Sequence, residues 1–348
     1  MRRNVRKTLV FLAKLLVAAG LLWLVFRKVH WSDYTVTIDG VKQLSRGLRS
    51  TITSANPYLL AGSFVGFAAT VFIMAFRWWY LLRVLHIRLR LWEAVRLTFL
   101  GTVFNYVVPG MVSGDLVKAY YVFKHTERKA AALVSIFVDR AVGLVQFAIL
   151  PAALMAVMVA VGAGTDRLAL PATVVAVVIG VMAFGLTVLF SARFRRVLRL
   201  DRLAARLPMQ RHLTVAAQAV SLYRRRSGAL VTALGMTFCG QTIFITAIMV
   251  AGLTLAPQIP WYQYYLYVPL IFIIAAVPIS PGSVGLTEAC FVMFLKSPVV
   301  TESEVLAVAL VARLFPMACS LPGLFVAVTG PKLPQAEQMA AEMAETDG

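Results

Sequence analysis

Two long apolar runs of this chain are each interrupted by prolines, glycines and charged residues, and these interruptions constrain the fold most. The first broken stretch covers residues 107–118 (VVPGMVSGDLVK) and the second covers 277–288 (VPISPGSVGLTE). Proline removes a helical donor and clashes with the preceding turn, so neither run forms one continuous helix. Within a bilayer, broken backbone is tolerated only where it is buried in protein or lines a cavity. Paired breaks in two halves of a chain are typical of a transporter's binding site.

The composition is that of a polytopic membrane protein. Hydrophobic residues make up 60% of the chain and charged residues 14%, with a mean hydropathy of +0.80. Soluble domains are nearer half apolar and a quarter charged. The net charge of +19 does not indicate nucleic-acid binding, because the basic residues cluster between apolar runs. Such clusters are typical of cytoplasmic loops.

Hydropathy predicts both complete and incomplete membrane crossings. A span needs ~20 apolar residues, and the runs that meet this length are 8–26, 57–76, 141–163, 168–190, 229–254 and 305–328. Two further runs, 91–109 and 263–280, end in the broken stretches and are followed by short apolar runs at 114–123 and 284–297. Each of these pairs forms either a re-entrant hairpin or two kinked spans. The predicted fold class is therefore all-α, a polytopic membrane helix bundle with six full spans and two broken or re-entrant helical hairpins.

Loop charge predicts the orientation. Ten arginines fall within 193–226, so the positive-inside rule places that loop in the cytoplasm. The basic loops 77–90 and 124–129 belong on the same side, and Arg77 is counted in the first of them. Loop 255–262 carries no charge and is expected outside. The apolar run after the basic N-terminus lacks a small-residue cleavage site, which predicts an uncleaved first span and cytoplasmic termini.

In this arrangement the two broken units point into the membrane from opposite faces, which is the geometry of an inverted repeat. Each unit has the same order: a span, an apolar run, a break, a short amphipathic run, and a span containing an arginine. The repeat-like units cover about 57–163 and 229–328 of a transmembrane domain at 1–330. Residues 331–348 form a short acidic tail.

Two arginines lie inside predicted spans. Arg313 is near the middle of the last span, and Arg140 occupies the corresponding span of the first unit. An arginine at the bilayer centre costs ~2.5–3.5 kcal/mol, so each should face the bundle interior and have a partner. We predict the pairs Glu288–Arg313 and Asp115–Arg140, because the members of each pair belong to one unit. These pairs either are structural or have a functional role, in which the arginine contacts an anionic lipid headgroup or belongs to an ion pair that switches partners.

The residues after each break are predicted to start helices. Ser113 and Ser280 are suited to cap them, with Pro281 at the first helical position of the second. A helix N-terminus inside the membrane offers free N–H groups and about half a positive charge, which suits a phosphate. Glycines at 110, 114, 282 and 285 would let a ligand approach the backbone closely. The alternative is that these stretches are tight turns with packing roles only.

The sequence contains no catalytic or metal-binding pattern. It has no Walker loop and no Ser-His-Asp set, and its four histidines and three cysteines lack ligand spacing. We therefore expect no enzymatic activity, no cofactor and no metal.

Several of these segments resemble the membrane domain of lysylphosphatidylglycerol synthases, whose stand-alone members are called flippase-like. The resemblance covers about residues 8–330, and its segments are Arg77-Trp78, Val108-Pro109, Ser113-Gly114-Asp115, Lys118, Asp139-Arg140-Ala141-Val142-Gly143-Leu144 and 278–288. It implies movement of a polar lipid between the leaflets of a bacterial or archaeal cell membrane. The aminoacyl-transferase domain of the full-length synthases is absent from this chain, so lysylation of lipid is not implied.

The chain departs mildly from that family's pattern. Ser113-Gly114 stands where a double glycine is common, Lys118 where arginine is usual, Asp139 where glutamate is usual, and Ser283 where glycine is usual. These changes keep charge and small size, but they leave the identity of the lipid open.

The leading hypothesis is a lipid translocase that moves a phospholipid or another anionic polar lipid between leaflets. One alternative is a membrane subunit that presents a lipid or glycolipid to a separate lipid-modifying enzyme. Another is an integral-membrane transferase that acts on a polyprenyl-phosphate lipid. The expected partners are membrane lipids with anionic headgroups, not nucleic acid. The candidate substrate-binding residues are Pro109, Gly110, Ser113, Gly114, Asp115, Lys118, Asp139, Arg140, Pro278, Pro281, Gly282, Gly285, Glu288 and Arg313.

Overall fold

Helices dominate the computed structural model of the chain. It describes residues 29–38, 41–107, 113–124, 126, 129–162, 169–190, 227–276 and 280–329, with single residues between 16 and 27. The predicted first span 8–26 lies largely outside these residues. The arginine-rich loop 193–226 and the tail 331–348 lie wholly outside them.

The helices fall into two sets with the same order. The first helical unit contains α3 (Pro57–Val84), α4 (Leu91–Val107), α5 (Ser113–Lys124), α6 (Lys129–Val161) and α7 (Ala169–Phe190). The second helical unit contains α11 (Ser227–Leu255), α12 (Trp261–Ala275), the 3-10 turn η2 (Pro281–Ser283), α13 (Leu286–Leu295), α14 (Glu302–Ser320) and α15 (Pro322–Thr329). In each unit a long helix is followed by a helix that stops at the break and by a short helix that returns from it.

Four segments are long and apolar enough to cross a membrane, among the residues that the structure describes: Pro57–Val84, Val138–Val161, Gly228–Leu255 and Glu302–Val328. They correspond to four of the six predicted full spans. The predicted span 168–190 is helical as α7, of which Pro171–Gly180 is described as a shorter apolar segment.

Local signals explain where two of these helices begin. The Asn56 side chain accepts a hydrogen bond of 2.9 Å from the Tyr58 N–H, and Pro57 occupies the first position of α3. The Thr301 hydroxyl and the Glu304 carboxylate cap the start of α14 in the same way. Such caps satisfy donors that the first helical turn leaves free.

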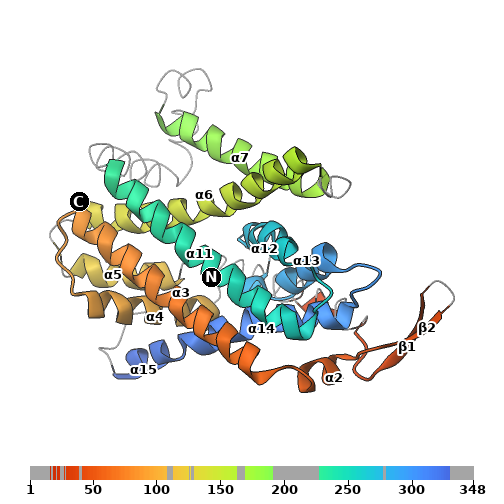
Figure 1. Ribbon diagram of the computed structural model, residues 1–348. Helices are drawn as coiled ribbons and strands as arrows, with labels where there is room; N and C mark the ends of the chain where they lie inside the picture. The colour runs from red at the N-terminus through yellow and green to blue at the C-terminus, as the bar shows by residue number, and fades with distance from the viewer. Residues whose placement is uncertain are drawn as a thin grey trace.

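The first helices of the two units pack along each other and run in opposite directions (Figure 1). Gly66 allows the close approach, since a Cβ there would lie 2.9 Å from the Cβ of Ala247. Hydrogen bonds join Asn56 to Thr254, Thr70 to Gly240, and Arg77 to Thr237. The residue numbers increase along α3 while those of the partners decrease along α11. The helix pair is therefore antiparallel.

Helices of each unit also pack on helices of the other unit. α4 packs on α14 and α15 of the second unit, while α12 packs on α6 and α7 of the first. α3 contacts α14, and α11 contacts α6. Two buried apolar clusters result, one centred on α12, α13 and α14 and the other on α4, α5 and the adjoining end of α3.

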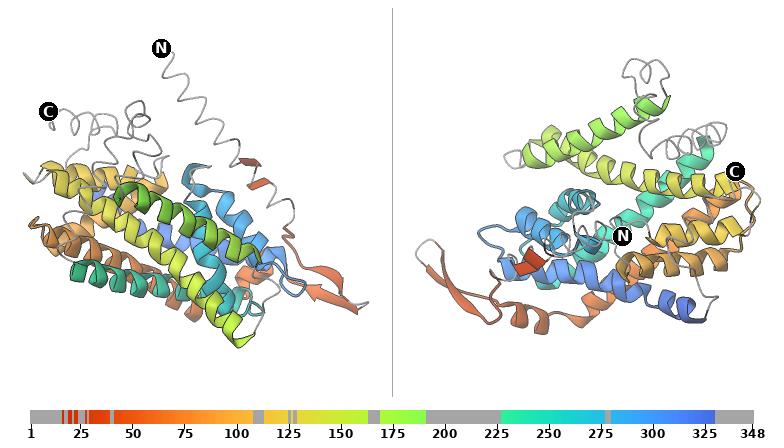
Figure 2. Two further views of the ribbon diagram at one scale, coloured as in Figure 1. Left: turned by 90° about the horizontal axis from the view of Figure 1, so that it is seen from above. Right: turned by 180° about the vertical axis from the view of Figure 1, so that it is seen from behind.

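A β-hairpin that the sequence analysis did not predict extends away from the bundle (Figure 2). Strands β1 (Tyr34–Ile38) and β2 (Val41–Ser45) pair antiparallel and lead into the short helix α2 (Leu48–Thr53). Asp33 fixes its base by accepting hydrogen bonds from the Ser50 hydroxyl and, at 2.8 Å, from the Gly47 N–H. These bonds hold the pKa of Asp33 below its ordinary value. The run of β-branched residues in β1, in which polar threonine alternates with apolar valine and isoleucine, is the sequence signal that could have revealed the strand.

Two other local expectations need correction. α3 continues to Val84, so the loop predicted at 77–90 begins two turns later and Arg77 lies inside the helix. In the second unit α13 does not start at Ser280-Pro281. Pro281–Ser283 form a short 3-10 turn, and the α-helix begins at Leu286. The hydroxyl of Ser280 donates to the Val284 carbonyl at 2.9 Å and does not cap the helix.

The hairpin of α4 and α5 depends on close backbone contact at Gly114. A Cβ at this position would collide with the carbonyl oxygen of Gly101 and the side-chain oxygen of Asn105. We expect Gly114→Ala to destabilise the protein, because overpacking costs ~1–3 kcal/mol. Gly143→Ala is the control, since a Cβ at Gly143 would meet nothing within 4 Å. Thermal unfolding of the purified variants measures the difference, and equal melting temperatures would contradict the packing described.

Candidate functional site

The two predicted ion pairs are present. Arg140 of α6 pairs with Asp115 of α5, and Arg313 of α14 pairs with Glu288 of α13. Each pair joins residues 25 positions apart in the chain. Arg140 and Arg313 both lie eleven residues after the first residue of their helix, Lys129 and Glu302. The structure confirms both pairings, and they occupy corresponding places in the two units.

The second pair is enclosed and fully engaged with the broken segment. The side chains of Glu288 and Arg313 are only 2% and 17% exposed. Besides two bonds to the Glu288 carboxylate, the Arg313 guanidinium donates to the carbonyls of Gly282 at 3.1 Å and Ser283 at 2.9 Å. Glu288 also accepts from the Gly285 N–H at 2.8 Å. Four of the five guanidinium donors are used in this way.

The backbone of this segment has the conformation that such contacts require. Gly282 and Ser283 have positive φ angles of 58° and 55°, and Gly285 has φ 80°. The carbonyls at 282 and 283 thereby reach Arg313, while Gly285 leaves its N–H for Glu288. The start of α13, predicted as a phosphate cradle, is thus met by the protein's own carboxylate.

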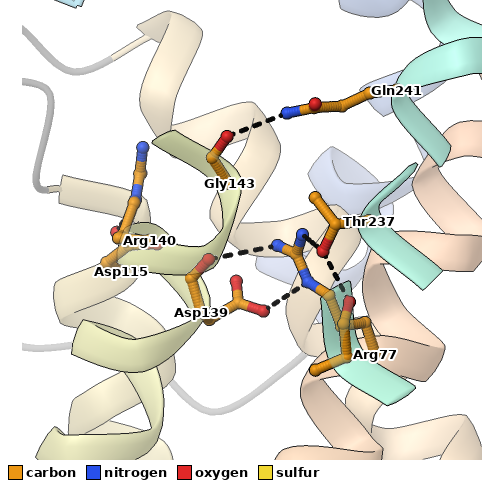
Figure 3. Close-up of polar contacts among 8 residues, drawn as sticks. Arg77, Asp115, Asp139, Arg140, Gly143, Thr237 and Gln241 are labelled. Atoms are coloured by element: carbon orange, nitrogen blue, oxygen red, sulfur yellow. Dashed lines mark hydrogen bonds and ion pairs between the residues drawn. The ribbon is translucent and has the colours of Figure 1, made fainter. Parts of the chain in front are cut away.

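The first pair is more open. The Arg140 side chain is 46% exposed, and its one hydrogen bond to a described residue goes to Asp115. Its guanidinium extends away from the neighbouring polar network (Figure 3). α5 begins at Ser113, as predicted, and the Gly114 N–H donates to the Asn105 side chain at 3.1 Å. Within the described part of the chain, Arg140 therefore keeps donors that a ligand could use.

A third ion pair was not predicted from the sequence. Arg77 is buried in α3 and donates to the Asp139 carboxylate at 2.8 Å and to the Asp139 carbonyl at 3.4 Å. It also donates to the Thr237 hydroxyl of α11 at 2.8 Å. Figure 3 shows the Arg77 guanidinium lying between α3, α6 and α11. Arg77 thus links both units through α6 and α11.

Lys118 of α5 completes the cluster. It is 8% exposed, and its ammonium lies 5.2 Å from the ring centroid of buried Trp78. Among the described residues it has no hydrogen bond or ion pair. Together with Arg77, Arg140, Asp115 and Asp139 it makes a group of three cations and two anions, with one positive charge in excess.

The structure thus groups the predicted site residues into two places. Asp115, Lys118, Asp139 and Arg140 lie together with Arg77 in the first unit, next to the start of α5 at Ser113 and Gly114. The second place is the second break, with Pro281, Gly282, Gly285 and Glu288, against which Arg313 of α14 packs. Pro109, Gly110 and Pro278 lie outside the described residues.

The pattern of both units is that of a known family. The family model described as the lysylphosphatidylglycerol synthase TM region matches residues 11–323. The chain belongs to this family. No match was found among curated proteins.

Membership of the lysylphosphatidylglycerol synthase TM family, with the apolar helices, makes the chain an integral membrane protein of a lipid-related family. The resemblance noted in the sequence is thereby confirmed. The match ends beyond both breaks, so it includes every candidate residue named above.

The two ion pairs should respond differently to exchange of their charges. Either single change at Glu288 or Arg313 leaves a buried charge unpaired, which typically costs ~3–5 kcal/mol. The double change Glu288→Arg with Arg313→Glu should not recover, because the new carboxylate would face the Gly282 and Ser283 carbonyls. In contrast, Asp115→Arg with Arg140→Asp should recover most of the folded protein, since Arg140 is half exposed and has one described partner.

The yield and melting temperature of monodisperse protein after extraction measure this contrast. Single variants at all four positions serve as references. Equal recovery by the two double changes would contradict the assignment of a structural role to Arg313.

Proposed function

We propose that this protein is a lipid translocase that moves an anionic polar lipid between membrane leaflets. The observation that carries the proposal is the cluster of Arg77, Asp115, Lys118, Asp139 and Arg140. Ionisable groups inside a membrane are costly and usually mark a substrate path. This cluster holds one cation more than it holds acids, and the surplus matches the charge of one phosphate diester.

Within this proposal Lys118 and Arg140 contact the headgroup. Lys118 is buried without a described ion-pair partner, and Arg140 has donors that no described residue accepts from. Arg77 and Arg313 are assigned to positioning, because hydrogen bonds within the protein already occupy their guanidinium groups. The acyl chains remain in the bilayer, and the polar groups reduce the cost of taking the headgroup through hydrocarbon. Translocation makes no bond, so no residue is assigned a catalytic role.

We further propose that the two helical units form an inverted repeat. The antiparallel packing of α3 and α11 supports this, because corresponding helices of oppositely oriented units run in opposite directions. The packing between the units also supports it, because α4 packs on the span formed by α14 and α15 as α12 packs on α6. The equal spacing of the ion pairs is a third correspondence.

The broken hairpins are proposed to be re-entrant. α5 has 12 residues and α13 has 10, whereas a span needs ~20. Each short helix packs on the helix before the break and on the long helix after it. The α4–α5 hairpin would then open to the cytoplasm and the α12–α13 hairpin to the outside.

Single cysteines test this orientation. We expect Lys124→Cys, at the end of α5, to react with a membrane-impermeant maleimide only from the cytoplasmic side. Trp261→Cys, at the start of α12, should react only from outside. The reference is a chain whose native cysteines are replaced by alanine. Labelling of both positions from the same side would contradict the opposed hairpins.

Transport itself is measured with fluorescent phospholipids in liposomes, by reduction of the outer leaflet's fluorophore. Lys118→Met should slow translocation by roughly 10- to 100-fold, since a hydrogen bond to a charged group contributes ~1.5–3 kcal/mol. Lys296→Met is the matched control. Its half-exposed ammonium pairs with Glu302, and such pairs contribute only ~0–1 kcal/mol.

Three outcomes would redirect the proposal. Equal rates for Lys118→Met and the unchanged protein would remove the headgroup role of Lys118. No translocation of several anionic lipids by folded protein would favour a subunit that presents lipid to an enzyme. Formation of a product from a polyprenyl phosphate and a nucleotide sugar would favour a transferase.

A further inference from the structure

A row of neutral polar side chains continues inward from the charged cluster, between α6 and α11. The Gln241 amide donates to the Gly143 carbonyl at 3.0 Å, one helical turn beyond the Arg77–Asp139 pair (Figure 3). Gln146 lies about one turn further along α6, and Thr242 is next to Gln241 on α11. Gln146 and Gln241 are 4% and 9% exposed.

These side chains keep unmatched polar atoms. The amide nitrogen of Gln146, the amide oxygen of Gln241 and the hydroxyl of Thr242 are buried and have no hydrogen-bond partner among the described residues. A buried polar group without a partner is costly, and such groups in a native structure require an explanation. A glutamine amide presents one donor end and one acceptor end whichever way it is turned.

An open apolar groove lies further along the same two helices, where they face α12. It has a volume of about 470 Å³ and is bounded by α6, α11 and α12. Its α6 wall includes Leu150 and Ala153, which follow Gln146 at the spacing of one helical face. On α11 its walls are Phe238 and Met249, and Thr242 lies on the same face between them. The residues of the polar row and those that line the groove therefore lie on the same faces of α6 and α11.

The groove continues to the aromatic end of α12. Trp261 and Tyr265 line it, and the Tyr265 hydroxyl is 2.7 Å from the hydroxyl of Thr246. Two of the helices that bound it, α6 and α11, contain candidate spans, and its walls include exposed apolar side chains such as Val157 and Phe238. In an integral membrane protein the apolar molecules facing such a groove are the hydrocarbon chains of lipids.

We propose that α6, α11 and α12 form a seat for a lipid whose headgroup carries hydroxyl groups. One acyl chain lies in the groove, and the headgroup hydroxyls bond to Gln146, Gln241 and Thr242. This inference rests on the proposed translocase function and names the headgroup class. The row requires a ligand that both donates and accepts hydrogen bonds. A hydroxyl does both, whereas a phosphate diester only accepts and an ammonium only donates.

Trp261 provides a probe of occupancy, because bromine atoms on a nearby acyl chain quench its fluorescence. The Trp261 signal is the difference between the protein and its Trp261→Phe variant, both in nanodiscs. The probes are dibromostearoyl forms of phosphatidylglycerol, glucosyl-diacylglycerol, phosphatidic acid and phosphatidylcholine. The first two carry hydroxyls, and the first and third carry negative charge.

We expect phosphatidylglycerol and the glucosyl lipid to quench Trp261 at about fivefold to tenfold lower mole fraction than phosphatidic acid and phosphatidylcholine. Stronger quenching by the glucosyl lipid than by phosphatidylglycerol would identify a sugar headgroup, and the reverse would identify glycerol. Gln146→Leu and Thr242→Val should each remove the preference without abolishing quenching by phosphatidylcholine. Ala153→Phe, which fills the groove, should weaken quenching by every probe.

Ala156→Phe is the matched control, since Ala156 is also exposed on α6 but does not line the groove. Thr242→Val preserves shape and carries the test if Gln146→Leu does not fold. Equal quenching by all four probes, or a preference that follows charge alone, would overturn the seat. So would a hydroxyl preference that survives both polar substitutions. The assay measures binding only, so a preference that persists without lipid crossing would refute the translocase and leave the seat in place.

Discussion

A buried guanidinium group determines the shape of the second broken segment. The apolar surroundings of Arg313 require a partner for its charge, and Glu288 supplies it. The same guanidinium donates hydrogen bonds to the carbonyls of Gly282 and Ser283. Both residues have positive φ angles, so they cannot belong to a regular α-helix. The turn, the delayed start of α13 and the packing of α13 on α14 all depend on this set of bonds.

The first unit has an ion pair at the corresponding positions, but its surroundings differ. Its arginine has the same spacing from its acid and from its helix start, but it is half exposed and has one described partner. In this unit the buried arginine that links helices is Arg77, which joins α3 to α6 and α11. Lys118, buried beside Trp78, adds a cation that no described acid pairs with directly. One unit therefore holds a closed ion pair, and the other holds an open, positively charged site.

Much of this arrangement could be predicted from the sequence, because bilayer burial permits few choices. Charges within apolar runs had to find partners, and membership in one unit was sufficient to pair Asp115 with Arg140 and Glu288 with Arg313. Arg77 was missed for a physical reason. It follows the last apolar residue of its run, where a cytoplasmic loop is the usual interpretation, but it is neutralised by Asp139, 62 positions away. The late start of α13 was missed for a similar reason, since Arg313 captures the preceding carbonyls from 30 positions away.

The surplus charge of the first unit has a consequence for cells that maintain a membrane potential. A full elementary charge moved through 100 mV changes its energy by about 2.3 kcal/mol. With a singly anionic lipid bound, the cluster of Arg77, Asp115, Lys118, Asp139 and Arg140 has no net charge, whereas without a lipid it carries one positive charge. Any rearrangement of the cluster across the field would then be voltage-sensitive in the unloaded protein and nearly indifferent to voltage in the loaded one. For the proposed translocation, the electrical cost of a cycle would fall on the return step of the empty protein.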